Sequence, residues 1–193
     1  MNRSIKSQIS DSIRVKKAIL NDPVLINSIK TAAERIVAAY RQGHKLLLAG
    51  NGGSAGDAQH IAGEMVNRFR FDRPALPALA LSTDTSVLTA IGNDSAFDQV
   101  FARQIQALGT AGDVFIGIST SGHSPNIIKA LQACARKHMF RIGLTGKSGG
   151  KMKALCDCCL RVPATDTPRI QEAHILIAHI LCEIIEETIF GQG

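Results

Sequence analysis

Five short apolar segments, separated by longer helical patterns, constrain the fold of this 193-residue chain more than any other feature. They span residues 45–49, 76–82, 113–119, 140–146 and 158–162. Segments this short and this apolar are typical of strands that are buried on both faces. Because a helical pattern separates each segment from the next, parallel pairing through βαβ units is predicted. We therefore predict an α/β three-layer sandwich around a five-stranded parallel sheet.

The helical patterns divide the chain into a single domain, residues 1–193. Residues 1–42 are predicted to form an N-terminal pair of helices, with Ile5, Ile9 and Ile13 on one face of the first. Residues 43–193 form the α/β core, including a C-terminal interface helix. Within this core, further helices are expected at residues 54–69, 85–91, 97–108 and 125–137, and from residue 168 onward.

The last helix is apolar on nearly every face between Ile175 and Ile185. A helix of this kind must be covered on all sides, which one small domain rarely achieves. The sequence therefore predicts a homo-oligomer that packs through this helix and the N-terminal pair.

Composition excludes several classes of function. The chain carries a net charge of +6, but its Lys and Arg residues are scattered, and with one Tyr and no Trp it has few stacking platforms. A nucleic-acid partner is therefore not expected. No apolar run approaches the roughly 18 residues of a membrane span, and the polar N-terminus lacks the apolar core of a signal peptide. We expect no membrane association and a cytoplasmic protein.

Three of the five cysteines, Cys156, Cys158 and Cys159, are clustered in the sequence CDCCLRV. No second Cys or His pair has zinc-ligand spacing relative to them, and the segment has the pattern of a short buried strand. We interpret these cysteines as small apolar core residues.

Two loops follow predicted strands and carry the chemistry of a phosphate site. After the third strand come four hydroxyl residues, Ser119, Thr120, Ser121 and Ser124, and then Pro125 at the start of a helix. A helix N-terminus offers free N–H groups and partial positive charge, and the hydroxyls add further donors. After the first strand come Asn51, Gly52 and Gly53, and these glycines allow the backbone to approach a ligand closely. Ligands of parallel sheets bind at this edge.

Acid/base and metal-binding side chains occur on two predicted helices. His60 and Glu64 are four residues apart and share one helix face. Gln171, His174 and His179 are polar residues in the otherwise apolar stretch of the C-terminal helix. A buried histidine needs a partner, and a core histidine bonded to a backbone carbonyl is the alternative to an active one. Spacing alone does not choose between His174 and His179.

Several motifs together resemble the sugar-isomerase (SIS) domain family and, within it, the phosphoheptose isomerases. These motifs are GNGGSAGDAQHIAGEM, TAIGND, GDVFIGISTSGHSPNIIKA, LTGKSGG and RIQEAHILIAHIL, and they span nearly the whole chain. The resemblance implies a flavodoxin-like sheet and a homotetramer whose active sites lie between subunits. It also implies conversion of sedoheptulose 7-phosphate to D-glycero-D-manno-heptose 7-phosphate, the first step toward the ADP-heptose of the lipopolysaccharide inner core.

The resemblance also implies roles for individual residues of this chain. Glu64 and His179 are its acid/base pair. The substrate-binding positions are Asn51, Gly52, Gly53, Glu64, Asn93, Asp94, Ser119, Thr120, Ser121, Ser124 and Gln171. One zinc ion per subunit is implied at His60, Glu64, Gln171 and His179.

A second resemblance leads to a different class of protein. The segments NRFRFDRPALPALAL and TDTSVLTAIGND resemble the DnaA initiator-associating protein, a non-catalytic SIS-domain tetramer that binds the replication initiator DnaA. That relative lacks the carboxylate and the imidazole at the positions of Glu64 and His179. Since proton transfer needs both groups and binding needs neither, their presence favours the enzyme.

Overall fold

The computed structural model describes residues 4–191, so residues 1–3 and 192–193 of the predicted domain lie outside the described part. Its elements are, in chain order, α1 (Ile5–Leu20), α2 (Pro23–Arg41), β1 (Leu46–Gly50), α3 (Gly53–Val66), β2 (Ala78–Ala80), α4 (Thr85–Asp94), η1 (Phe97–Gln99), α5 (Val100–Leu108), β3 (Val114–Ile118), α6 (Pro125–Arg136), β4 (Phe140–Thr145), η2 (Gly150–Ala154), β5 (Cys158–Arg161) and α7 (Thr167–Phe190).

All five strands pair in parallel, in the order β2-β1-β3-β4-β5. This is the flavodoxin-like order, in which the chain reverses its direction of travel between β1 and β3. In the register of that pair, Gly50 lies opposite Ile118, so both strands end at the same level. The loops that follow them are therefore neighbours at the carboxyl edge of the sheet.

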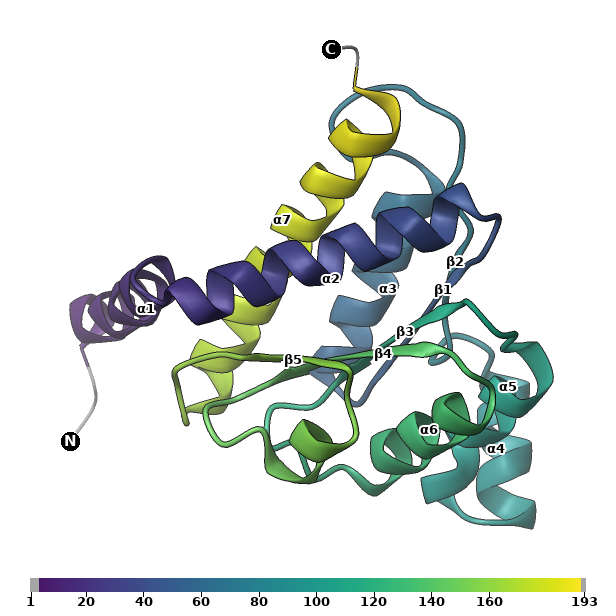
Figure 1. Cartoon of the computed structure of the whole chain (residues 1–193). Helices are drawn as coiled ribbons and strands as arrows, with labels where there is room; N and C mark the ends of the chain where they lie inside the picture. Colours follow the sequence, from purple (N-terminus) through teal and green to yellow (C-terminus); the bar gives the residue numbers. More distant parts are fainter. Residues whose placement is uncertain (1–3, 192–193) are drawn as a thin grey trace.

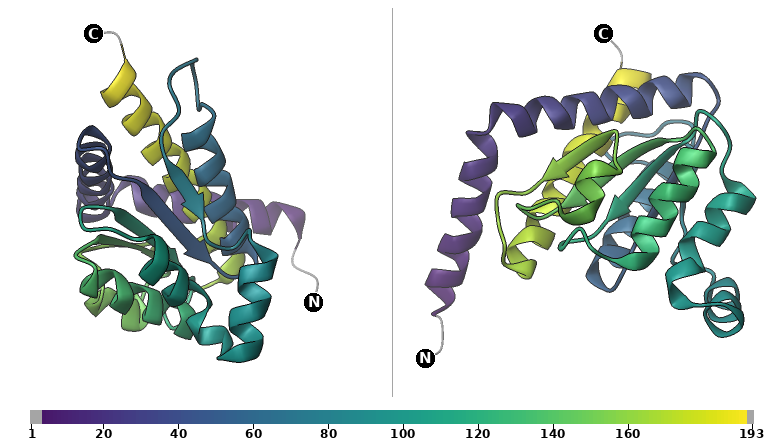
Figure 2. Two further views of the ribbon diagram at one scale, coloured as in Figure 1. Left: turned by 90° about the vertical axis from the view of Figure 1, so that its right-hand side faces the viewer. Right: turned by 60° about the horizontal axis from the view of Figure 1, so that its bottom comes forward.

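Helices cover both faces of the sheet and give the predicted three-layer sandwich (Figure 1). Alternate residues of β1 show the two faces: Leu46 and Leu48 pack with α2, α3 and α7, whereas Leu47 and Ala49 pack with α5 and α6. The right-hand view of Figure 2 shows α1 extending beyond the sheet on the side opposite α4 and α5.

The structure corrects several predicted boundaries. The second strand is Ala78–Ala80 rather than residues 76–82, because it is an edge strand and Pro77 has no N–H group for the ladder. The third helix ends at Val66 rather than residue 69. The helix predicted at residues 97–108 begins as the 3₁₀ turn η1 and becomes α-helical only at Val100.

The clustered cysteines are less uniformly buried than predicted. The side chain of Cys158 is buried and donates a hydrogen bond to the carbonyl of Ser28 at 3.4 Å. Cys156 and Cys159 are only half-buried. The alternation of β5 turns Cys159 to the face of the sheet opposite Cys158, whereas Cys156 precedes the strand.

None of the helices in residues 4–191 combines the length and the apolar character needed to cross a bilayer.

Candidate functional site

The loops after β1 and β3 are joined by a reciprocal pair of amide hydrogen bonds. Nδ2 of Asn51 donates to Oδ1 of Asn126 at 3.0 Å, and Nδ2 of Asn126 donates to Oδ1 of Asn51 at 2.8 Å. Asn126 is buried at the start of α6 and its Oδ1 also accepts the N–H of Ile127. The glycine-rich loop is therefore held against the N-terminus of α6.

The hydroxyl groups of the serine loop converge at the same edge. Oγ of Ser119 lies 2.8 Å from Oγ of Ser124 and 3.4 Å from Oγ of Ser121. Ser124 occupies the N-cap position of α6, but its hydroxyl makes no capping bond and turns to Ser119 instead. The hydroxyl of Ser121 accepts the N–H of His123 at 3.1 Å. Three hydroxyls beside an uncapped helix N-terminus form a suitable environment for an anion.

Two glycines let neighbouring groups approach these loops. A Cβ atom at Gly122, whose φ is +68°, would lie 2.2 Å from the carbonyl oxygen of Gly149, so the serine loop packs directly on the backbone before η2. A Cβ at Gly53 would lie 2.5 Å from Nε2 of Gln171. The predicted substrate residue Gln171 therefore lies against the glycine-rich loop.

His60, Glu64 and His179 form one cluster between α3 and α7. Nε2 of His60 lies 2.8 Å from Nε2 of His179 and 3.4 Å from Oε1 of Glu64. The two imidazole rings are 5.0 Å apart at their centroids, and the ring of Phe69 lies 5.6 Å from that of His179. The carboxylate and the imidazole predicted to act together thus share one neighbour, although they come from helices far apart in the sequence.

The structure shows that His174 is the core histidine. Its side chain is fully buried, and Nε2 donates to the carbonyl of Thr145 at 3.2 Å. Burial lowers the pKa of His174 to about 4, against the opposing effect of the Thr145 hydrogen bond. A ring that is neutral and enclosed cannot exchange protons readily at neutral pH, so of the two candidates only His179 has the surroundings of an acid/base group.

Asn93 and Asp94 lie on the exposed end of α4, where Nδ2 of Asn93 donates to Oδ1 of Asp94 at 2.8 Å. Within residues 4–191 no hydrogen bond connects them to the histidine cluster or to the serine loop. No residue of α4 is buried, although the helix carries Val87, Leu88 and Ile91. The role of Asn93 and Asp94 in substrate binding stays a prediction.

The donor set of the predicted zinc site is partly assembled. Zinc ligands in a tetrahedron are about 3.3 Å apart, given Zn–N distances of about 2.0 Å. The His60–Glu64 separation of 3.4 Å matches, and the 2.8 Å His60–His179 separation needs to open by a fraction of an ångström. The side chain of Gln171 lies against Gly53. Among the described residues, no group of three or more His, Cys, Asp or Glu has metal-holding geometry. Imidazole and carboxylate groups, such as those of His60, His179 and Glu64, are donors that suit zinc.

Sequence reasoning missed several residues of the site. Asp57 lies one turn before His60 on α3, and its Oδ2 is buried without a hydrogen-bond partner among the described residues. Burial raises the pKa of this carboxyl, and the nearby His60 opposes the shift. The i, i+3 spacing to His60 was the available signal for Asp57. No local pattern indicated Asn126, because its partner Asn51 is distant in the sequence.

The sequence matches one family model and is highly similar to two phosphoheptose isomerases. Residues 13–146 match the SIS domain family model. Phosphoheptose isomerase 2 of Campylobacter jejuni is 61% identical over all of this chain and 96% of its own length, and phosphoheptose isomerase of Aneurinibacillus thermoaerophilus is 60% identical over 98% of this chain and 96% of its own.

Solved structures of phosphoheptose isomerases superpose closely on this chain. Phosphoheptose isomerase GmhA of Neisseria gonorrhoeae superposes with a TM-score of 0.89 at 46% identity, covering 95% of this chain and 97% of that one. A phosphoheptose isomerase of Francisella tularensis gives 0.91 at 41% identity, covering 95% and 96%. The chain therefore belongs to the SIS domain family and, within it, to the phosphoheptose isomerases.

Proposed function

We propose that this protein isomerises sedoheptulose 7-phosphate to D-glycero-D-manno-heptose 7-phosphate. The observation that carries the proposal is the cluster in which Glu64 of α3 and His179 of α7 both contact His60, beside loops suited to phosphate. Its high-identity relatives carry the name phosphoheptose isomerase. In this proposal the reaction takes place in the cytoplasm and is the first step toward ADP-heptose and the lipopolysaccharide inner core.

Ketose-to-aldose conversion moves a hydrogen between two neighbouring carbons through an enediolate. Glu64 removes the proton from C1 while His179 supplies a proton to the carbonyl oxygen at C2. In the second half of the reaction, the hydroxyl proton on C1 is withdrawn and C2 is protonated, which leaves an aldehyde at C1. One group must act as an acid while the other acts as a base, and a carboxylate with an imidazole meets this need.

The phosphate of the substrate lies in the serine loop. Ser119, Thr120, Ser121 and Ser124 donate hydrogen bonds to it, with the N-terminus of α6. Asn51, Gly52, Gly53 and Gln171 contact the sugar between phosphate and cluster. Binding energy from the distant phosphate then holds the reacting carbons beside Glu64 and His179.

A zinc ion is proposed for the same cluster. His60, Glu64 and His179 would hold it, with the amide oxygen of Gln171 as fourth ligand after this side chain turns from Gly53. A bound zinc ion polarises carbonyl and hydroxyl oxygens and so stabilises developing negative charge.

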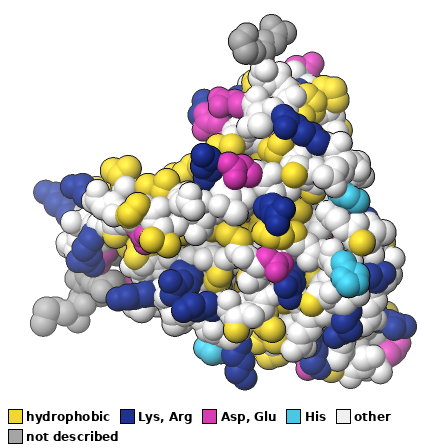
Figure 3. Space-filling view, in the orientation of Figure 1, with side chains coloured by type: hydrophobic (Ala, Val, Ile, Leu, Met, Phe, Trp, Pro, Cys, Tyr) yellow, Lys and Arg dark blue, Asp and Glu magenta, His cyan; other side chains and the backbone are white. Residues whose placement is uncertain are grey.

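We further propose a homotetramer. An apolar groove with a volume of about 650 Å³ runs between α1, α2 and α7, lined by Ile13, Ile19, Leu20, Ile26, Ile29, Leu176, Ile180 and Ile184 with Lys16, Lys17 and Lys30 at its margins. Hydrophobic side chains are visible over this part of the surface at the left of Figure 3. The absence of any buried residue on α4 also favours a neighbouring subunit there, which would complete the pocket around Asn93 and Asp94.

The decisive experiment is an isomerase assay on sedoheptulose 7-phosphate, with and without a chelator. Turnover of this ketose supports the proposal, and loss of turnover in chelator that zinc restores supports the metal site. A protein that shows no turnover with added zinc and that captures purified DnaA would instead be the non-catalytic tetramer.

A further inference from the structure

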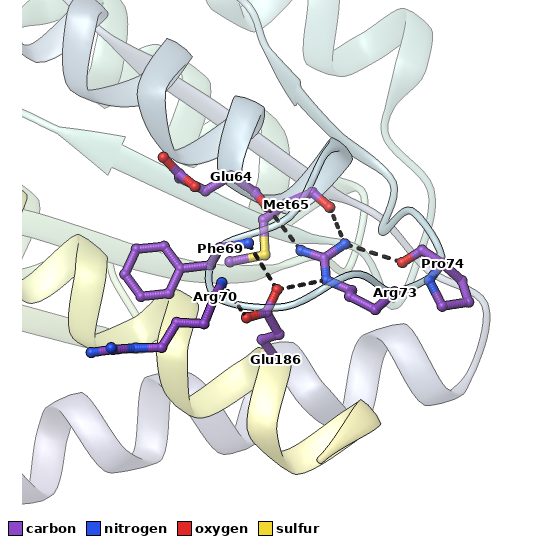
Figure 4. Close-up of polar contacts among 7 residues, drawn as sticks. All are labelled: Glu64, Met65, Phe69, Arg70, Arg73, Pro74 and Glu186. Atoms are coloured by element: carbon purple, nitrogen blue, oxygen red, sulfur yellow. Dashed lines mark hydrogen bonds and ion pairs between the residues drawn. The ribbon is translucent and has the colours of Figure 1, made fainter. Parts of the chain in front are cut away.

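A buried ion pair joins Arg73 and Glu186 close to the last turn of α3 (Figure 4). Their side chains are 2% and 1% exposed, and Nε of Arg73 lies 3.0 Å from Oε1 of Glu186. Arg73 belongs to the segment between α3 and β2, and Glu186 to α7. Burying two charges carries a large desolvation cost, so the pair must be supported by further hydrogen bonds.

Both carboxylate oxygens of Glu186 accept hydrogen bonds. Oε1 accepts the backbone N–H of Phe69 at 2.8 Å together with Nε of Arg73, and Oε2 accepts the backbone N–H of Arg70 at 2.7 Å. These bonds hold the pKa of Glu186 below its ordinary value, against the opposing effect of burial. The carboxylate therefore stays ionised at neutral pH and fixes the backbone that follows α3.

The guanidinium group of Arg73 binds the end of α3 itself. Nη2 donates to the carbonyl oxygen of Glu64 at 2.8 Å, and Nη1 donates to that of Met65 at 2.7 Å. These carbonyls belong to the last turn of the helix, which has no intrahelical donors for them. Arg73 thus holds the backbone of the residue proposed as the catalytic base, as the dashed lines of Figure 4 show.

The same network reaches the imidazole of His179. Glu186 fixes the backbone of Phe69, and the ring of Phe69 lies 5.6 Å from the ring of His179. Glu186 is also seven residues after His179, two turns along the same helix, so both side chains project from similar faces of α7.

We propose that Arg73 and Glu186 are positioning residues for the isomerase reaction. They hold Glu64 and His179 in the relative position that proton transfer requires. This inference rests on the proposed function. Neither residue touches the substrate: Arg73 acts through the backbone of Glu64, and Glu186 acts through Phe69. A displacement of about 1 Å between reacting groups can lower the rate about 100-fold, so a shift in the relative position of Glu64 and His179 is measurable.

Arg73→Lys tests the link to Glu64. A lysine keeps the positive charge for Glu186 but lacks the planar fork that reaches two helix carbonyls. Phe69→Leu tests the link to His179, because it removes the ring and keeps the backbone N–H that Glu186 accepts. Asp157→Asn is the control: it weakens the ion pair between Arg141 and Asp157, whose nearest atoms are 2.6 Å apart and which lies by β4 and β5, at the edge of the sheet away from β2.

Two measurements separate positioning from general stability. The first is kcat and KM per folded enzyme, with melting temperature measured in parallel. The second is the ratio of solvent deuterium incorporated at C1 and C2 to net turnover. This ratio depends on how the enediolate is reprotonated in each active molecule, so a smaller folded fraction alone does not change it.

We expect Arg73→Lys and Phe69→Leu to lower kcat about 10- to 100-fold, with KM within about threefold of the parent and an altered deuterium ratio. Asp157→Asn should keep the parental kcat and ratio. Parental kcat and deuterium ratio in folded Arg73→Lys and Phe69→Leu overturn the inference while the proposed function stands. If Arg73→Lys does not fold, Phe69→Leu decides by the same criteria. A parent without turnover refutes the proposed function and the inference with it.

Discussion

At the scale of single residues, two histidines on one helix show how position determines chemistry. His174 and His179 are five residues apart on α7, yet one is enclosed against Thr145 and the other faces His60. The sequence offered both as candidates because each interrupts the same apolar helix. Only the surroundings of each ring, which the fold creates, distinguish a structural histidine from a candidate acid/base group.

The role of Glu64 as base leads to the first prediction. Glu64→Gln should lower kcat at least ~100-fold, the usual contribution of a positioned base, because an amide cannot accept the proton from C1. Steady-state kinetics on sedoheptulose 7-phosphate measure the effect. Glu34→Gln, an exposed carboxylate of α2 paired with Lys30, is the control. Activity of Glu64→Gln within a factor of two of the parent would remove Glu64 from this role.

The two histidines should respond differently to substitution. His179→Ala should lower kcat by about 100-fold with little change in melting temperature, because its ring is only half-buried. His174→Ala should lower the free energy of unfolding by about 2 kcal/mol or more, because it leaves a cavity in the core, and should keep most of the kcat of the folded enzyme. The reverse pattern would show that His174 is the active residue.

The pKa of His174 predicts a specific pH dependence of stability. This pKa falls from 6.5 in the unfolded chain to about 4 in the folded protein, so the unfolded state binds the proton first as the pH falls. The contribution of His174 to the free energy of unfolding is fully present above pH 6.5. It is lost as the pH falls toward 4, by up to about 3 kcal/mol in total. Urea unfolding at several pH values measures this slope. His174→Gln should flatten it between pH 6.5 and 4, and an unchanged slope would contradict the assignment.

At the scale of elements, function depends on how helices begin. The serine at the N-cap of α6 leaves the helix uncapped and joins the other hydroxyls. An uncapped N-terminus loses stability that a capping bond would provide, typically about 1 kcal/mol. The partial positive charge of the helix terminus then remains available for an anion, beside hydroxyl groups that can donate hydrogen bonds to a phosphate.

The phosphate assignment predicts a selective effect on binding. Ser121→Ala should raise KM about tenfold, the equivalent of one lost hydrogen bond to a charged group, and change kcat less. Measuring KM for the substrate and the inhibition constant for inorganic phosphate checks both ends of the claim. Ser148→Ala, a serine whose hydroxyl accepts the N–H of Gly150, is the control. An unchanged inhibition constant for inorganic phosphate in Ser121→Ala would show that the phosphate binds elsewhere.

At the scale of the whole molecule, one chain leaves apolar surface uncovered. Ile13 is 48% exposed beside the groove of α1, α2 and α7. Ile13→Glu should therefore split the proposed tetramer into smaller species without unfolding the chain, because a charge is costly in an apolar interface. Light scattering at micromolar concentration measures the mass. Leu108→Glu, 42% exposed on α5 and outside the groove, should keep the parental mass. A monomeric parent would remove the oligomer proposal.

The sequence by itself determined the sheet, the layers and the loops. Each of these follows from local patterns: buried apolar runs for β1 and β3, and serines before Pro125 for the phosphate loop. Edge strand β2 was predicted too long, since the pairing partner and Pro77 decide where an edge strand ends. The sequence motifs alone also indicate His60, Glu64 and His179 as candidate site residues.

Tertiary structure alone decided which polar groups meet. The Asn51–Asn126 amide pair joins residues that are 75 positions apart in the sequence, and Arg73 binds Glu186, which is 113 positions away. No local pattern encodes such contacts, because a side chain acquires a partner only when packing brings two elements together. Burial likewise separated His174 from His179, since the solvation of a ring depends on everything that surrounds it and not on its neighbours in the chain.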